Sequence, residues 1–111
     1  MKIVQDKGEG FLKLSIAGDL DANSSIYADE VIQKAFDTKQ FKIIIDCKQL
    51  NYISSAGLGV FVSHIDNFKT NKGDLVLYNL NNNVLDVFKT LGLDSILKIV
   101  TNESDARALF N

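Results

Sequence analysis

The sequence lacks proline and tryptophan altogether and has one cysteine, Cys47, in 111 residues. A lone cysteine excludes a disulfide bond within the chain. The first eight residues carry no apolar run of the kind that a secretory signal peptide needs, so we predict a cytoplasmic protein. No apolar stretch approaches the roughly 20 residues that span a bilayer. Any association with a membrane is therefore expected to go through a partner.

The chain also lacks a strong charge imbalance, low-complexity segments and internal repeats. Its 12 Lys and Arg residues are scattered along the sequence and its formal net charge is −2, whereas nucleic-acid binding normally shows as a basic patch. Hydrophobic residues make up 46% of the sequence and charged residues 23%, which is typical of a folded globular domain. We predict one domain over residues 1–111, with no nucleic acid among its partners.

Hydrophobic patterning divides the chain into strands and helices that alternate after an initial hairpin. The predicted strands cover residues 2–5, 11–17, 41–47, 75–78 and 96–100, and the predicted helices cover residues 26–38, 55–71, 84–91 and 104–110. Strands that alternate with helices form right-handed crossovers and parallel sheets. The predicted fold class is therefore α/β, with an N-terminal β-hairpin followed by β-α units that form a mostly parallel sheet of about five strands with about four helices.

Two of these elements carry more specific expectations. Residues 41–47 are nearly continuous β-branched hydrophobes, which is typical of a central strand that is buried on both faces. For the first helix, residues 23–25 are candidate N-caps, and either Ile26 or Tyr27 belongs to the apolar face.

The start of the second helix breaks a local rule. From Leu58 onward, apolar residues recur at helical spacing. Glycine costs about 0.8–1.0 kcal/mol relative to alanine within a helix, yet Gly57 and Gly59 both lie near this helix start. Bare backbone there indicates either the close approach of another segment or a surface on which a partner or an anion meets the helix.

Two loops at the carboxyl ends of neighbouring strands, residues 18–21 and 50–55, are predicted to lie side by side. The second loop holds Ser54 and Ser55, each of which is placed to cap the helix, and a hydroxyl there is also placed for phosphorylation. The two aspartates of the first loop are interpreted as solvated turn acids, because they lack the further oxygen ligands that a metal ion requires.

The remaining reactive side chains do not predict a catalytic site. Asp46 is interpreted as a turn-former or cap at the end of its strand, His64 as a surface residue and Cys47 as an inert core thiol. The Gly-Leu-Gly sequence at 57–59 lacks the lysine and the spacing of a phosphate-binding loop. No triad, carboxylate pair or metal cluster emerges, so we predict that the protein is not an enzyme and uses no cofactor or metal.

Three segments of the chain together form a recognisable pattern. They are Ile16-Ala17-Gly18-Asp19-Leu20-Asp21, Ile43-Ile44-Ile45-Asp46 and Tyr52-Ile53-Ser54-Ser55-Ala56-Gly57-Leu58-Gly59-Val60. With them the chain resembles, over essentially its whole length, the STAS domain family and specifically its single-domain anti-sigma factor antagonists. The family pattern usually reads Asp-Ser-Ser/Thr-Gly-Leu-Gly. Here Ser54 replaces the aspartate before the acceptor, and Ala56 replaces the hydroxyl residue after it.

The resemblance implies that Ser55 is a phosphoacceptor, with Ser54 as its rival. It implies one partner that is both an anti-sigma factor and a serine kinase, and a serine phosphatase that reverses the modification. The unphosphorylated antagonist binds the kinase and frees the sigma factor, and the phosphorylated antagonist lets go. A monomer or weak dimer is expected. The predicted partner-binding residues are Asp19, Asp21, Ser54, Ser55, Ala56, Gly57, Leu58, Gly59 and an exposed Val60.

Two other hypotheses stay open. Some single-domain STAS proteins that this chain resembles assist a membrane lipid-transport ATPase as non-switching accessory subunits. A neighbouring gene for a histidine-kinase-like ATPase would favour the switch, whereas one for a transporter would favour the subunit. The remaining hypothesis, a sensor of a small ligand or nucleotide, has no motif in the sequence.

Overall fold

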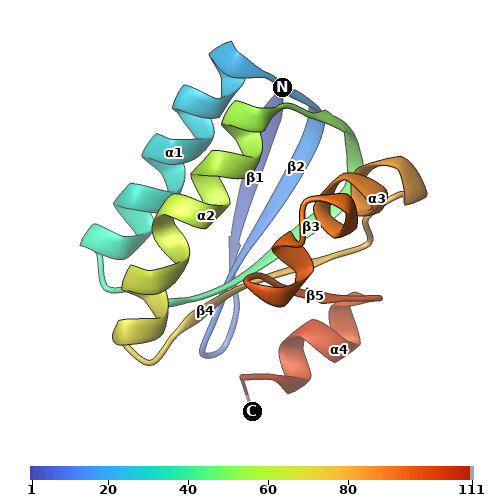
Figure 1. The fold of residues 1–111 in the computed structure, drawn as a ribbon. Helices are drawn as coiled ribbons and strands as arrows, with labels where there is room; N and C mark the ends of the chain where they lie inside the picture. The colour runs from blue at the N-terminus through green and yellow to red at the C-terminus, as the bar shows by residue number, and fades with distance from the viewer. Residues whose placement is uncertain (111) are drawn as a thin grey trace.

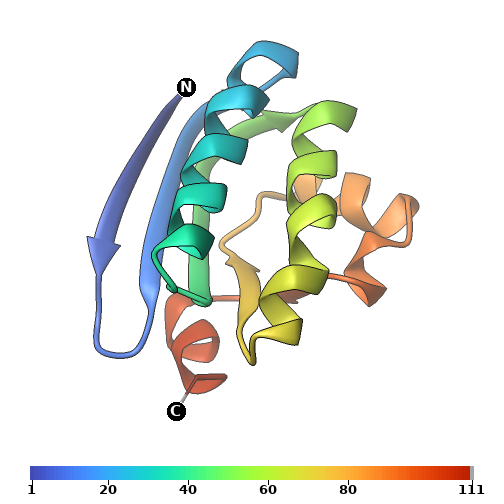
Figure 2. The same cartoon turned by 90° about the vertical axis from the view of Figure 1, so that its left-hand side faces the viewer.

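The computed structural model describes residues 1–110 as a five-stranded mixed sheet with four helices (Figures 1 and 2), which confirms the predicted α/β class. The elements, in chain order, are β1 (Lys2–Lys7), β2 (Leu12–Leu20), α1 (Ala22–Asp37), β3 (Lys42–Ile53), α2 (Ser55–Thr70), β4 (Asp74–Tyr78), α3 (Asn82–Thr90), a 3-10 turn (Leu93–Ser95), β5 (Lys98–Val100) and α4 (Glu103–Ala108). Within residues 1–110, no helix is both long and apolar enough to cross a membrane.

The strands lie in the order β1-β2-β3-β4-β5, with β1 antiparallel to β2 and every other pair parallel. The hairpin and the central position of β3 are therefore confirmed. Ile43 and Ile45 point into the core beneath α1 and α2, while Ile44 points to the opposite face, and all three side chains are fully buried. Burial on both faces is the reason that this strand reads as a continuous hydrophobic run.

Helices α1 and α2 lie side by side on one face of the sheet (Figure 1). The prediction for α1 is wrong only in the first turn, where Ile26 and Tyr27 are 63% and 45% exposed, whereas Ser25 and Ala28 are buried. Further along the helix, Val31, Ile32 and Ala35 are buried as their spacing predicts. The small side chains of Ser25 and Ala28 let the start of α1 pack closely against its neighbours. The two large side chains are thereby left on the surface.

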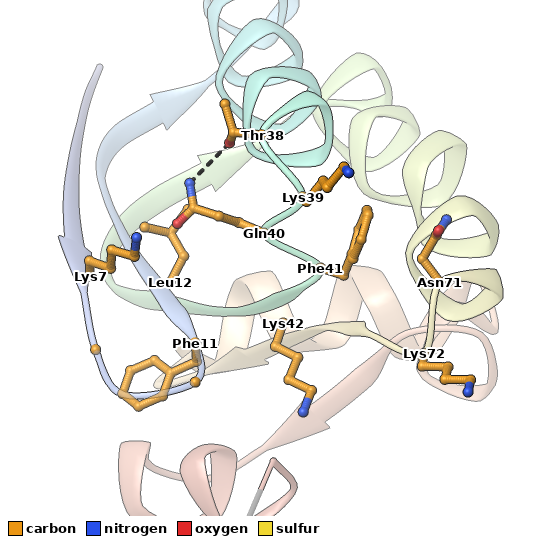
Figure 3. Close-up of a pocket in the computed structure, with 12 residues that line it drawn as sticks. Lys7, Phe11, Leu12, Thr38, Lys39, Gln40, Phe41, Lys42, Asn71 and Lys72 are labelled. Atoms are coloured by element: carbon orange, nitrogen blue, oxygen red, sulfur yellow. Dashed lines mark hydrogen bonds between the residues drawn. The ribbon is translucent and has the colours of Figure 1, made fainter.

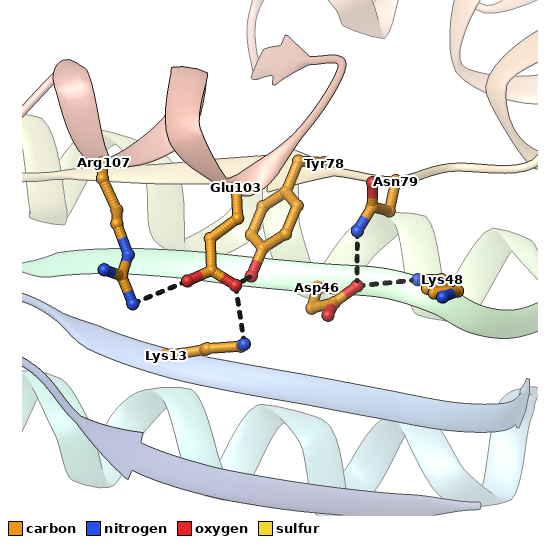
Figure 4. A network of polar contacts seen from close by, with 7 residues as sticks. All are labelled: Lys13, Asp46, Lys48, Tyr78, Asn79, Glu103 and Arg107. Atoms are coloured by element: carbon orange, nitrogen blue, oxygen red, sulfur yellow. Dashed lines mark hydrogen bonds and ion pairs between the residues drawn. The ribbon is translucent and has the colours of Figure 1, made fainter.

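The other face of the sheet is covered by α4, which packs Ala106 over Ile44 and Tyr78. Glu103 ties this helix to the sheet: its Oε1 accepts from Lys13 Nζ at 2.7 Å and from the Tyr78 hydroxyl at 3.3 Å (Figure 4). Its Oε2 lies 2.6 Å from Arg107 Nη2. The hydrogen bond from Lys13 is the largest cause that holds the pKa of Glu103 below its ordinary value.

Two strands run further than predicted. β2 continues through Gly18 and Asp19 to Leu20, and β3 continues to Ile53, where the sequence indicated loops. The turn-forming residues lie at register irregularities between the two strands, and Gly18 adopts a φ of +101° there. Such irregularities bend a paired strand without ending it.

Two further expectations are wrong for a shared reason. His64 is only 6% exposed, and its Nε2 lies 2.7 Å from Asp29 Oδ1 on α1. Asp46 lies within β3 instead of ending it, and its Oδ1 accepts from the backbone N–H of Lys48 and from Asn79 Nδ2 (Figure 4). In both cases the side chain can leave the solvent because another element supplies a hydrogen-bond partner, which is Asp29 for His64 and Asn79 for Asp46. Cys47 is buried as predicted, and burial raises the pKa of its thiol.

Candidate functional site

The N-termini of α1 and α2 meet at the end of the molecule where β2 and β3 finish (Figure 1). The carbonyl oxygen of Leu20, the last residue of β2, accepts hydrogen bonds from the backbone N–H of Ser54 at 2.9 Å and from its hydroxyl at 3.1 Å. The segments that precede the two helices are therefore neighbours, as the strand order predicted. The site is built from these two helix starts.

The two adjacent serines have different surroundings. Ser54 is the N-cap of α2: its half-buried hydroxyl oxygen accepts from the backbone N–H of Gly57 at 3.2 Å while donating to Leu20. Ser55 is the first residue of the helix and is exposed. Its hydroxyl makes no hydrogen bond with any residue from 1 to 110. Ser54 therefore serves the fold, and the hydroxyl of Ser55 is available to react.

Asp21 is the N-cap of α1, which corrects the prediction of a cap among residues 23–25. Its Oδ1 accepts from the backbone N–H of Ser24 at 2.9 Å, and the hydroxyl of Ser24 accepts from the backbone N–H of Asp21 at 2.9 Å. These reciprocal bonds form a capping box. The bond from the Ser24 backbone is the largest cause that lowers the pKa of Asp21, so this carboxylate stays ionised beside the start of α2.

The two glycines of α2 face different surroundings. A Cβ on Gly57 would lie 2.8 Å from Leu20 Cγ, 2.9 Å from the Leu20 carbonyl oxygen and 2.9 Å from Ile53 Cγ1. A Cβ on Gly59 would have no heavy atom within 4 Å. Close packing against β2 and β3 therefore explains Gly57, and Gly59 leaves an open spot on the surface of α2.

The predicted partner-binding residues divide by exposure. Asp19, Asp21, Ser55, Ala56 and Gly59 are exposed, Ser54 is half-buried, and Gly57, Leu58 and Val60 are buried. The expectation that Val60 is exposed is wrong, since only 7% of its surface is accessible. Val60 lies on the side of α2 that turns toward α1, where it packs into the main core.

Three large exposed side chains near this site were missed. Ile26 and Tyr27 on α1 stand out as described above, and Tyr52 near the end of β3 is 53% exposed. Ile26 borders a shallow hollow of about 310 Å³ between α1 and α2, together with Ser25, Asp29, Ala56, Gly59, Val60 and Ser63. Tyr52 was detectable in principle, because it precedes buried Ile53 and successive strand residues point to opposite faces.

Across the described residues 1–110, no three His, Cys, Asp or Glu side chains gather where they could hold a metal ion. The surface around Ser55 instead combines an uncommitted hydroxyl, two exposed aspartates and exposed apolar side chains. Such a combination suits contact with another protein, because exposed apolar side chains with a polar border are typical of interaction sites.

Comparison with known proteins gives a consistent result. The family model described as "STAS domain" matches residues 2–106. The chain is 30% identical over 94 residues to the anti-sigma-B factor antagonist of Bacillus subtilis, with 84% of each protein covered. It is 26% identical over 106 residues to the anti-sigma-B factor antagonist of Listeria monocytogenes, with 92% of this chain and 90% of the relative covered.

The fold is also similar to solved structures of the anti-sigma factor antagonist SpoIIAA. The unphosphorylated form gives a TM-score of 0.75 at 16% identity, with 96% of this chain and 94% of that chain covered. The phosphorylated form from Bacillus gives a TM-score of 0.75 at 18% identity, with coverage of 97% and 99%. At these identities the likeness shows that the fold is shared.

Proposed function

The chain belongs to the STAS domain family, and on this basis we propose that it is an anti-sigma factor antagonist. In this proposal it binds an anti-sigma factor that is also a serine kinase, and phosphorylation of Ser55 ends the binding until a serine phosphatase restores it. The names of the Bacillus and Listeria relatives support the antagonist role. The role also agrees with the predicted cytoplasmic location.

The different environments of the two serines carry the choice of Ser55. Its side chain is exposed and makes no hydrogen bond within residues 1–110, so a kinase can reach it without breaking a structural contact. The hydroxyl of Ser54 joins α2 to Leu20 through two hydrogen bonds. Phosphorylation of Ser54 would remove the hydroxyl proton that Ser54 donates to the carbonyl oxygen of Leu20. It would also place a bulky group against β2.

The electrostatics of the site support a switch that leaves the fold intact. A phosphate on Ser55 adds about −1.5 to −2 charges at pH 7. At the N-terminus of α2 this charge is favourable, because the unpaired backbone N–H groups and the helix dipole attract anions. The exposed aspartates Asp19 and Asp21 oppose it. A surface that is partly apolar before modification thus becomes strongly acidic, and a partner with an apolar or acidic face is repelled.

The exposed side chains indicate where the partner lies. Ile26 borders the hollow beside Gly59, which has room for a partner side chain. Exposed Tyr27 lies in the first part of α1, and exposed Tyr52 lies two residues before the N-cap of α2. Aromatic side chains at such a place commonly supply much of the binding energy of an interface. We infer that the partner contacts the starts of α1 and α2 together.

The experiment that tests this proposal incubates the protein and ATP with a candidate anti-sigma factor kinase from the same genome, and locates phosphate by mass spectrometry. Two variants distinguish the serines. Ser55→Ala removes the proposed acceptor. Ser54→Gly removes the rival hydroxyl, and glycine at the N-cap lowers helix stability by only a few tenths of a kcal/mol relative to serine. Phosphate is expected on Ser55 in the wild type and in Ser54→Gly, and none in Ser55→Ala. Phosphate on Ser54 in the wild type would contradict the assignment.

Binding is measured separately with Ser55→Asp, which introduces a negative charge at the same place. We expect its affinity for the partner to fall by at least about tenfold, the equivalent of 1.4 kcal/mol. Wild-type affinity in this variant would refute the switch. Co-purification with a lipid-transport ATPase, together with no binding to a kinase, would instead favour the non-switching accessory subunit.

A further inference from the structure

A second surface feature lies at the end of the molecule opposite Ser55. There, three connections come together, namely the β1–β2 turn, the α1–β3 connection and the α2–β4 connection (Figures 1 and 3). They enclose an open pocket of about 450 Å³. A volume in this range is typical of sites for small organic ligands.

The pocket has an apolar floor and a basic rim. Phe11, Leu12 and Phe41 supply the apolar surface, and the ring of Phe41 is held edge-on by aromatic rings of α1 and α2. Four lysines border the pocket (Figure 3), and none of the residues that line it is acidic. The four are Lys7, Lys39, Lys42 and Lys72.

None of these four ammonium groups lies within 4.0 Å of a carboxylate of residues 1–110. The sequence indicated that the basic residues are scattered, and the fold gathers these four from three separate connections. A pocket that is bordered by four lysines without partnered acids has a positive potential, which attracts an anion. Their grouping therefore points to an anionic ligand.

Two of the lysines occupy backbone conformations that favour glycine. Lys39 and Lys72 both have a φ of +64°, just beyond the C-terminal caps of α1 and α2. Glycine usually takes this position, because a Cβ is strained in the left-handed region. The attraction between a lysine and the C-terminal end of a helix dipole does not explain Lys39 and Lys72, since Lys34 and Lys69 in the last turns of α1 and α2 already supply that charge. Both helices thus end on a strained lysine that borders the same pocket.

We propose that this pocket binds a small organic phosphate that carries an aromatic or other apolar group. Lysine is a common point-charge ligand for phosphate, and the rim of this pocket offers four lysines with flexible side chains. Phe11 and Phe41 offer apolar surface to the rest of the molecule. The site is separate from the Ser55 surface, so this inference does not depend on the proposed antagonist role.

The experiment uses 1-naphthyl phosphate as the probe and follows backbone amide resonances by ¹⁵N NMR. Inorganic phosphate, 1-naphthol and phosphatidylglycerol vesicles are titrated in parallel. We expect the naphthyl phosphate to bind at least about tenfold more tightly than inorganic phosphate or naphthol, with shifts in residues 38–42 and 71–73. Binding should weaken as salt rises, because ions screen exposed charges. Equal affinity for the three soluble probes, or binding to the vesicles alone, would overturn the proposal.

Variants make the test specific. Lys42→Gln is expected to weaken binding about threefold to fivefold, within the range for an exposed ion pair, while Lys89→Gln on α3 serves as a matched control that leaves it unchanged. Lys72→Gly is expected to weaken binding and also to raise Tm, because it relieves a strained φ. A lysine with only a structural role would not weaken binding when replaced. Unchanged affinity in both Lys42→Gln and Lys72→Gly would therefore overturn the proposal.

Discussion

Replacing Gly57 by alanine tests the closest contact at the site. The added Cβ would lie under 3.0 Å from the carbonyl oxygen of Leu20 and from side-chain atoms of Leu20 and Ile53. The carbonyl cannot easily move away, because it accepts two hydrogen bonds from Ser54. Overpacking of this kind costs about 1–3 kcal/mol, and a fixed backbone oxygen places the cost near 2–3 kcal/mol.

Alanine also improves helix propensity by about 0.8–1.0 kcal/mol over glycine. The expected net loss for Gly57→Ala is therefore about 1–2 kcal/mol. For a chain of this size, Tm changes by about 4 °C per kcal/mol, so Tm should fall by about 4–8 °C. Urea denaturation and differential scanning calorimetry measure both quantities.

Gly59→Ala is the matched control, since it makes the same change two residues later in the same helix. Its Cβ would meet no heavy atom within 4 Å, so only the propensity gain remains and Tm should rise by about 4 °C. If both variants gained stability equally, the close approach at Gly57 would be refuted. A more stable Gly59→Ala protein that binds its partner less well would place Gly59 within the interface.

Three further predictions concern capping and pH. Ser54→Ala should lower the free energy of unfolding by about 0.5–2 kcal/mol through loss of the N-cap, whereas Ser55→Ala should change it by less than about 0.5 kcal/mol, as urea denaturation will show. Lys13 helps to lower the pKa of Glu103, so the stabilisation is present above pH 4.5, its ordinary pKa, and is lost as the pH falls through the lowered pKa; Glu103→Gln should flatten this acid limb in melts taken from pH 2 to pH 7. Burial raises the pKa of Asp74, so its ionisation destabilises the fold as the pH rises through that raised pKa; Asp74→Asn should therefore raise Tm at pH 7, and a lower Tm would contradict this.

The fold was predictable where one local pattern decided the outcome. Ile43, Ile44 and Ile45 form a continuous β-branched run, and only a strand covered on both faces suits such a run. Gly92 follows the C-cap of α3 in the left-handed conformation, with a φ of +71°, where glycine is commonly found. In these places propensity and packing favour the same structure.

Prediction failed where two local signals competed. Ile26 and Tyr27 are more hydrophobic than Ser25 and Ala28, yet close helix packing needs the smaller pair inside. Gly18 has the properties of a turn residue, but it lies at an irregularity within β2. Hydrophobicity and turn propensity describe single residues, and the packing of neighbouring elements overrides them.

The sequence by itself determined the order and type of the elements, the family, and the pair of serines at which a function should be sought. Only the tertiary structure decided that Ser54 caps α2 and Ser55 remains exposed, because the distinction depends on the carbonyl of Leu20, 34 residues away. It also decided that His64 is buried, through Asp29 on a neighbouring helix. The basic pocket has the same origin, since Lys7 and Lys72 are distant in the chain from Lys39 and Lys42, and the four border one pocket only when three connections meet at one end of the sheet.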